Sequence, residues 1–150
     1  MRIIIQRVSK ASVSVDSNLI SSIENGYLLL VGIGESDTEE DIEWLSKKIT
    51  NLRIFSDEKG QMNHSIIDID GEILAISQFT LFAKTKKGNR PSFIKAAPPN
   101  IALPLYDLFV DSLNKLLNKP VQKGVFGAHM EVSLINDGPV TIFIDSKNRE

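Results

Sequence analysis

Two short segments of this 150-residue chain carry the polar groups from which a catalytic site could be built. In the first, Ser77-Gln78-Phe79-Thr80-Leu81, strand alternation would place the Gln78 amide and the Thr80 hydroxyl on one side. The second is Asn136-Asp137-Gly138-Pro139-Val140-Thr141, in which glycine frees the backbone and proline fixes φ, so that two carbonyl oxygens can lie side by side. Either segment can also be ordinary structure, the first an amphipathic strand and the second a hairpin turn. The chemistry available is that of hydroxyls, amides, carboxylates and backbone groups.

The composition excludes most other kinds of active site. The chain has no cysteine, which rules out disulfides, thiolate nucleophiles, zinc knuckles and iron–sulfur ligation. His64 is expected in a surface turn and His129 in a structural role, and with only these two histidines we predict no metal site. The sequence contains neither a Gly-x-Ser-x-Gly elbow nor a phosphate-binding glycine loop. A Ser-His-Asp triad and nucleotide hydrolysis are therefore disfavoured.

The charge of the chain is unevenly distributed. The 17 basic and 19 acidic residues give a net charge of -2, which argues against a general nucleic-acid binder. No acidic residue occurs between Glu72 and Asp107, however, and this stretch contains five cations: Lys84, Lys86, Lys87, Arg90 and Lys95. They belong either to a solvated loop that keeps the protein soluble or to a loop that contacts phosphate groups, for which local positive charge is sufficient.

Apolar periodicity predicts several strands and one helix in the first half of the chain. We expect strands over residues 2–8, 11–16 and 19–23, and the almost wholly apolar residues 26–33 indicate a strand buried on both faces. Ser36-Asp37-Thr38-Glu39 fits a capping box, so a helix is expected to follow it. The apolar stripe of that helix is Ile42, Leu45, Ile49 and Leu52.

The second half of the chain continues the alternation of strand and helix. Strands are expected over residues 52–55 and 72–81, and the proline-containing residues 84–100 are expected to form an extended surface loop. Helical spacing follows over residues 105–117, with Pro104 near the start of the helix. The last two strands are expected at residues 130–136 and 140–145, joined through Asp137-Gly138-Pro139.

These elements predict a single α/β domain over residues 1–150. A chain of this length with 42% hydrophobic residues and no long linker has the size of one ordinary domain. The many strands and two helices predict curved β-sheets, barrel-like or layered, with the helices packed on one face. No apolar run approaches the ~20 residues that a membrane span needs, and the first residues do not fit a signal peptide. We therefore predict a cytoplasmic protein with no membrane partner.

The two polar segments, in this order and spacing, resemble those of the D-aminoacyl-tRNA deacylase family. The resemblance covers nearly the whole chain. It includes four further segments: Met1-Arg2-Ile3-Ile4-Ile5-Gln6-Arg7-Val8, Asn51-Leu52-Arg53-Ile54-Phe55, Lys87-Gly88-Asn89-Arg90-Pro91-Ser92-Phe93 and Gly124-Val125-Phe126-Gly127-Ala128-His129-Met130. Phe79 favours the D-specific branch, because a sister group that edits L-alanine carries alanine at that position.

The resemblance implies hydrolysis of the ester that joins a D-amino acid, or glycine, to the terminal ribose of tRNA, with no metal or cofactor. It implies a homodimer in which Gly138 and Pro139, joined in cis, enter the partner subunit's pocket and reject L-aminoacyl-tRNA. Arg7 is implied to brace that dipeptide, and Met130 to bind substrate. The implied catalytic residues are Ser77, Gln78, Phe79 and Thr80, and the implied tRNA-binding residues are Lys84, Lys86, Lys87 and Arg90.

An aminoacyl ester is already activated, so oriented backbone amides and a positioned water or hydroxyl are sufficient for its hydrolysis. Two routes fit the sequence: Thr80 attacks the ester directly, or Thr80 positions a water molecule, with help from the ribose hydroxyl of the substrate. We favour the second route, because no residue in the segment is an obvious base for Thr80. Two other functions also fit: an RNA-binding module in which Phe93 stacks on an unpaired base, and a structural dimer in which residues 137–139 form only a turn.

Overall fold

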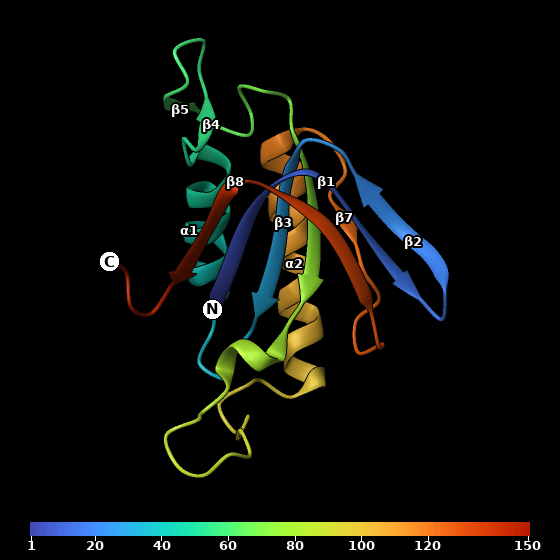
Figure 1. Ribbon diagram of the computed structural model, residues 1–150. Helices are drawn as coiled ribbons and strands as arrows, with labels where there is room; N and C mark the ends of the chain where they lie inside the picture. Colours follow the sequence, from blue (N-terminus) through green and yellow to red (C-terminus); the bar gives the residue numbers. More distant parts are fainter.

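One long strand, β1 (Arg2–Val15), organises the sheet of this computed structural model, which describes residues 1–150. β8 (Glu131–Asp145) pairs antiparallel with β1 over nearly its whole length. Along its other edge β1 pairs antiparallel with β3 (Gly26–Gly32) through its first half and with β2 (Asn18–Ile23) through its second half. β6 (Glu72–Ser77) then pairs in parallel with β3. The result is a curved, nearly closed, barrel-like sheet (Figure 1).

Two helices cover one face of this sheet (Figure 1). α1 (Glu39–Asn51) and α2 (Pro99–Leu117) pack against each other, and the main core lies between them and the sheet. The largest fully buried side chains of that core include Tyr27, Phe109, Ile3, Ile5, Leu29 and Leu45. A second, smaller core on the opposite face of the sheet contains Val8, Ala11, Val13, Ile23, Leu28, Leu74 and Ile76. β3 is therefore buried on both faces, which explains its almost wholly apolar sequence.

Three short elements complete the fold. β7 (Gln122–Lys123) pairs in parallel with β6 at the edge of the main sheet. β4 (Phe55–Ser56) and β5 (Met62–His64) form a separate two-stranded sheet. A 3-10 turn, η1 (Phe79–Phe82), follows β6. No helix is long and apolar enough to cross a bilayer.

The predicted α/β architecture is confirmed, but several strand boundaries were wrong. The strands expected at residues 2–8 and 11–16 are one continuous strand, β1, and those expected at residues 130–136 and 140–145 are likewise one strand, β8. β1 and β8 pair on both sides of the register shifts near Val8, so neither strand ends there. Pairing between the two ends of the chain is not visible in local sequence periodicity.

The helix limits also differ from the predicted ones. The N-cap of α1 is Thr38, whose amide donates to the Asp41 carboxylate at 2.9 Å, so the capping box lies two residues later than expected. Leu52 follows the helix, and the strand expected at residues 52–55 is reduced to β4. α2 begins at Pro99, six residues before the predicted start at residue 105. Proline is tolerated in the first helical turn, which is where Pro99 lies, whereas Pro104 lies inside the helix and not near its start. His64 is half-buried in β5 instead of lying in a surface turn.

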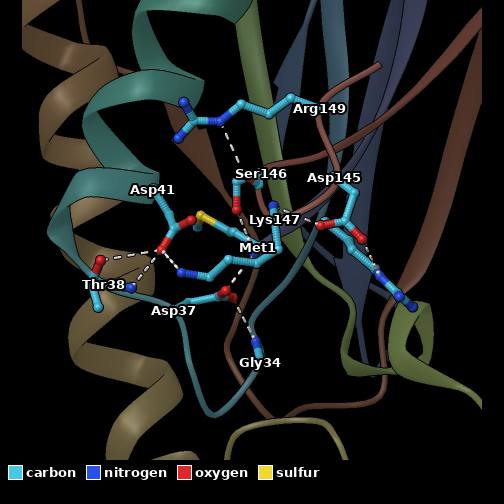
Figure 2. Close-up of polar contacts among 10 residues, drawn as sticks. Met1, Gly34, Asp37, Thr38, Asp41, Asp145, Ser146, Lys147 and Arg149 are labelled. Carbon is cyan, nitrogen blue, oxygen red and sulfur yellow. Dashed lines mark hydrogen bonds and ion pairs between the residues drawn. The ribbon is translucent and has the colours of Figure 1, made fainter.

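Polar contacts join the two ends of the chain to the start of α1 (Figure 2). The Met1 amino group donates to the Asp37 carboxylate and to the Ser146 hydroxyl, the latter at 2.7 Å. Lys147 forms an ion pair with the buried Asp41, also at 2.7 Å. Burial raises the pKa of Asp41, but its hydrogen bonds with Lys147, Ser146 and Thr38 outweigh this and hold that pKa well below its usual value. These contacts fix the start of β1 and the end of β8 against α1.

Candidate active site

A cavity of about 560 Å³ opens at the ends of two parallel strands. This volume is in the range of small-molecule sites. Its walls come from the ends of β3 and β6, the segment before α2, the first turn of α2 and the segment before β8. The lining residues are mostly apolar: Val31, Ile33, Ile76, Ser77, Gln78, Phe79, Phe93, Ala96, Ala97, Pro99, Ala102, Phe126, Gly127, Ala128, His129, Met130 and Val132.

Residues 77–79, the first three of the four predicted catalytic residues, form one edge of this cavity. β6 ends at Ser77, which pairs with Val31, and the Gln78 amide donates to the Val31 carbonyl at 2.7 Å. The chain then enters η1, so the predicted strand through residue 81 was wrong, and strand alternation does not place these side chains. The turn brings the same two side chains together by another route, because the Gln78 side-chain amide donates to the Thr80 hydroxyl at 2.5 Å.

Within this segment the side chains differ in their relation to the cavity. Ser77, Gln78 and Phe79 line it, whereas Thr80 is exposed and does not belong to its wall. The Phe79 ring is 57% exposed and meets the Phe93 ring edge-on, with 5.1 Å between the ring centroids. These two rings form an apolar rim on which a planar or aromatic group can rest.

The opposite wall of the cavity contains the residues just before β8. Met130, predicted to bind substrate, is half-buried there, and so close to Gly124 that a Cβ atom on Gly124 would lie 2.5 Å from the Met130 sulfur. His129, expected to be structural, is exposed and is the one lining residue with an ionisable side chain. The described chain holds no group of three or more His, Cys, Asp or Glu side chains suited to a metal ion.

Gly138 and Pro139, the second predicted segment, do not form a hairpin turn. β8 continues through them, and pairing with β1 passes from Asn136 opposite Val8 to Thr141 opposite Gln6, so residues 137–140 bulge outward opposite Arg7. We call these four residues the 137–140 bulge. The Gly138-Pro139 peptide bond is cis, and both residues are exposed. The hairpin expectation failed because β1 offers pairing on both sides of the bulge.

Arg7 holds the base of the 137–140 bulge. Its buried guanidinium donates to the Asp137 carbonyl at 3.0 Å and to the Ile54 carbonyl at 2.6 Å, and it forms an ion pair with the Asp137 carboxylate at 3.1 Å. The Asn136 amide donates to the carbonyls on both flanks, those of Arg7 at 3.0 Å and Val140 at 2.9 Å. The bulge is thereby fixed to the sheet and to the segment after α1.

Within one chain, the 137–140 bulge lies away from residues 77–80. The bulge is opposite Arg7, which pairs with Tyr27 of β3, whereas Ser77 pairs with Val31. Four residues along a strand correspond to about 13 Å. Neither Gly138, Pro139 nor Arg7 lines the cavity. One chain alone therefore does not bring the two predicted segments together.

The predicted tRNA-binding residues lie in the loop that links η1 to the cavity wall. Lys84, Lys86, Lys87 and Arg90 are all exposed, and Lys84 forms an isolated β-bridge with Ser92. Phe93, which follows directly, reaches the cavity rim. Positive charge is thus concentrated beside the cavity, on a loop that contains no acid.

Sequence reasoning missed much of the apolar wall. Ala96, Ala97 and Ala102 line the cavity from the expected loop and the start of α2, and Phe126 lines it from the segment before β8. Small residues leave space beside a backbone, but they show no periodicity that would mark them as part of a site. One available signal was the cluster of alanines and prolines at residues 96–104.

The chain is similar to known proteins over nearly its whole length. A family model described as D-Tyr-tRNA(Tyr) deacylase matches residues 4–145. Relatives from Flavobacterium psychrophilum and Parabacteroides distasonis, both described as D-aminoacyl-tRNA deacylase, are 63% and 60% identical over 150 residues, covering 100% of each chain. A solved structure described as c-Myc DNA Unwinding Element Binding Protein has a TM-score of 0.92 at 42% identity, covering 97% of this chain and 98% of that one. Another, described as a probable eukaryotic D-amino acid tRNA deacylase, has a TM-score of 0.79 at 16% identity, covering 95% and 97%, and shows likeness of fold alone.

Proposed function

The chain belongs to the D-Tyr-tRNA(Tyr) deacylase family, a family of hydrolases, and we propose that it removes D-amino acids and glycine from tRNA while leaving L-aminoacyl-tRNA intact. Its relatives support D-aminoacyl-tRNA deacylation, the hydrolysis of an ester bond. The observation that carries the proposal is the apolar cavity bordered by residues 77–79, with exposed cations beside it. Because its substrate is made during translation, we place the activity in the cytoplasm.

The cavity suits the aminoacylated end of tRNA. It is lined by apolar groups, including the rings of Phe79, Phe93 and Phe126, which accept a nucleoside base or an amino-acid side chain. Its polar side chains are those of Ser77, Gln78 and His129. The exposed cations of residues 84–90 extend from the same rim, where the phosphates of the acceptor end would follow. The ester, between base and amino acid, would lie beside residues 77–80.

Selection between mirror-image substrates requires a steric wall, because D- and L-aminoacyl esters share every atom and differ only in the direction of Cβ. We assign this wall to the carbonyl groups of Gly138 and Pro139. Their attachment to Arg7 through Asp137 supports the assignment, since a wall must be rigid to exclude a single methyl group. Glycine has no Cβ and would pass the wall, which is why we include glycyl-tRNA among the substrates.

A second copy of the chain would supply the wall. Residues 137–139 of the 137–140 bulge are exposed, and the bulge lies away from residues 77–80 of its own chain. Two large apolar side chains flank it on the outer face of β8, Ile135 at 54% and Phe143 at 58% exposure. Burying these side chains between two copies is favourable, and a homodimer would let each copy insert its bulge into the site of the other.

Within this site we propose that water, and not Thr80, attacks the ester. The Thr80 hydroxyl oxygen accepts from the Gln78 side-chain nitrogen, and an amide is too weak a base to take the hydroxyl proton. His129 is the one ionisable side chain in the cavity wall, and no hydrogen bond joins it to Thr80, which lies outside that wall. An unassisted hydroxyl is a poor nucleophile at neutral pH, so Thr80, with its oxygen held by Gln78, instead orients a water molecule or the ribose hydroxyl of the substrate.

Replacing Thr80 with valine should lower kcat for D-tyrosyl-tRNA about tenfold, because a positioning hydroxyl is lost while the shape is kept. Thr80 is exposed, so Tm should not change. Single-turnover hydrolysis at saturating enzyme measures the effect, with Thr80→Ser as the variant that keeps the hydroxyl. A loss of more than about a thousandfold in Thr80→Val, with Thr80→Ser active, would assign the nucleophile to Thr80.

Matched mirror-image substrates test the function itself. We expect purified protein to release D-tyrosine from D-tyrosyl-tRNA over many turnovers, to release glycine from glycyl-tRNA, and to leave L-tyrosyl-tRNA at its spontaneous rate. Equal hydrolysis of the D and L substrates would contradict the proposal. Salt-sensitive tRNA binding with no turnover would instead establish an RNA-binding module.

A further inference from the structure

We propose that Arg2, at the start of β1, is a positioning residue for the deacylation reaction, because it holds the turn that carries Phe79 and Thr80. This inference rests on the proposed function. Arg2 is far from residues 79–82 in sequence and does not line the cavity. Its role follows from what its guanidinium contacts.

The turn η1 has little burial of its own to fix it. None of its four residues is buried, and Phe79 and Thr80 are exposed. Its entry is held by the bond from the Gln78 amide to Val31. Its far half leans on the exit of β3, where a Cβ atom on Gly32 or Gly34 would come within 2.9 Å of Leu81 or Phe82. A turn packed on only one side needs a second contact to set its orientation.

Arg2 supplies that second contact in two ways. Its guanidinium donates to the Leu81 carbonyl at 2.9 Å, and it lies over the Phe82 ring at 4.6 Å from the ring centroid. The first contact fixes the backbone of the residue directly after Thr80, and the second fixes the last side chain of the turn. Arg2 pairs with Gly32, so the start of β1 and the end of β3 hold η1 together.

Asp145, the last residue of β8, orients the Arg2 guanidinium. The two side chains form an ion pair at 2.9 Å, with 31% of Arg2 and 13% of Asp145 exposed. Burial raises the pKa of Asp145, but the Lys147 backbone amide and the Arg2 side chain outweigh this and hold that pKa below its usual value. Asp145 is thus charged at neutral pH. The planar fork of arginine can pair with this carboxylate, donate to a carbonyl and stack on a ring at once, which the single ammonium of lysine cannot do.

The test compares Arg2→Gln with Lys123→Gln in the full-length protein. Lys123→Gln breaks another partly exposed ion pair, with Asp107 at 3.2 Å, that has no contact with η1. We expect Arg2→Gln to lower kcat for D-tyrosyl-tRNA about tenfold, with KM changed less than about twofold, and Lys123→Gln to leave both unchanged. Arg2→Lys should recover only part of the rate, because it keeps the charge without the fork.

Hydrogen exchange of peptides covering residues 78–83 gives a readout that does not depend on catalysis. The amides of Leu81 and Ala83 are bonded within this turn, so we expect their exchange to rise several-fold in Arg2→Gln and not in Lys123→Gln. Wild-type exchange in Arg2→Gln, or a rise spread evenly over the whole chain, overturns the inference, as does an unchanged kcat. If the wild-type protein shows no hydrolysis, the proposed function fails, whereas the exchange result still reports whether Arg2 orders the turn.

Discussion

Replacing Gly138 with alanine is expected to raise hydrolysis of L-tyrosyl-tRNA about a hundredfold, while hydrolysis of D-tyrosyl-tRNA falls only a few-fold. Gly138 has φ +132°, a backbone conformation that residues with a Cβ rarely adopt. An added Cβ would lie 2.7 Å from a methyl group of Val140 and 3.1 Å from the Arg7 guanidinium. The 137–140 bulge must therefore move relative to Arg7. Together, the rise for the L substrate and a roughly threefold fall for the D substrate change the D/L ratio about three-hundredfold, which corresponds to about 3.5 kcal/mol of lost discrimination.

The matched control is Gly60→Ala. Gly60 also has a positive φ, +76°, but a Cβ there meets nothing within 4 Å, and the residue lies in an exposed turn outside the site. Both variants carry the backbone cost of alanine at positive φ, so the control separates that cost from displacement of the wall. Initial rates on both mirror-image substrates, with Tm for each variant, decide the matter. A folded Gly138→Ala protein with the wild-type D/L ratio would show that Gly138 and Pro139 do not reject the L substrate.

Removing four cations beside the cavity should raise KM for D-tyrosyl-tRNA about a hundredfold at low salt and leave kcat nearly unchanged. The substitutions are to glutamine at Lys84, Lys86, Lys87 and Arg90, which are exposed on one loop. Each cation that contacts a phosphate contributes roughly 0.7 to 0.9 to the slope of log affinity against log salt. The slope should therefore fall by about 3, and the two proteins should converge at high salt.

A control is needed to separate the effect on KM of lowering the net charge from the effect of losing contacts between the loop and phosphate groups. A control with glutamine at Lys47, Lys48, Lys59 and Lys115 removes the same amount of charge from exposed positions elsewhere on the surface. We expect it to change KM less than threefold at low salt, because none of these lysines belongs to the loop beside the cavity, and a cation that contacts no phosphate releases no counterion from the nucleic acid. Equal losses in the two quadruple variants would show that the loop contacts no phosphate, and would assign residues 84–90 to solubility.

Local patterns predicted those elements whose determinants lie within a few residues. The stripe Ile42, Leu45 and Ile49 marked α1 correctly, because helical burial repeats every three to four residues, and all three side chains are buried. The apolar run at residues 26–33 marked β3 as buried on both faces, and both cores confirm it. The failures have the opposite character. Asp137-Gly138-Pro139 has the composition of a turn, yet pairing with β1, more than a hundred residues earlier, keeps β8 continuous through it.

The candidate site divides in the same way. Its residues could be named from sequence because the two polar segments and the acid-free stretch are local features. The arrangement of these residues in space could not be predicted from the sequence. Strand alternation predicted Gln78 and Thr80 on one side, and the two side chains do meet, but through a 3-10 turn whose position depends on Gly32, Gly34 and Arg2. Nothing near residue 80 in the sequence indicates that the turn contacts Arg2 and the end of β3.

The sequence by itself determined the family, the two polar segments and the local positive charge, because each depends on residue types at short spacing. Only the tertiary structure decided that Ser77, Gln78 and Phe79 border an apolar cavity, and that the 137–140 bulge lies away from it within one chain. The physical reason is that a cavity and a strand register are made by contacts between distant segments, whose free energy depends on packing across the whole sheet and is not encoded by any one stretch.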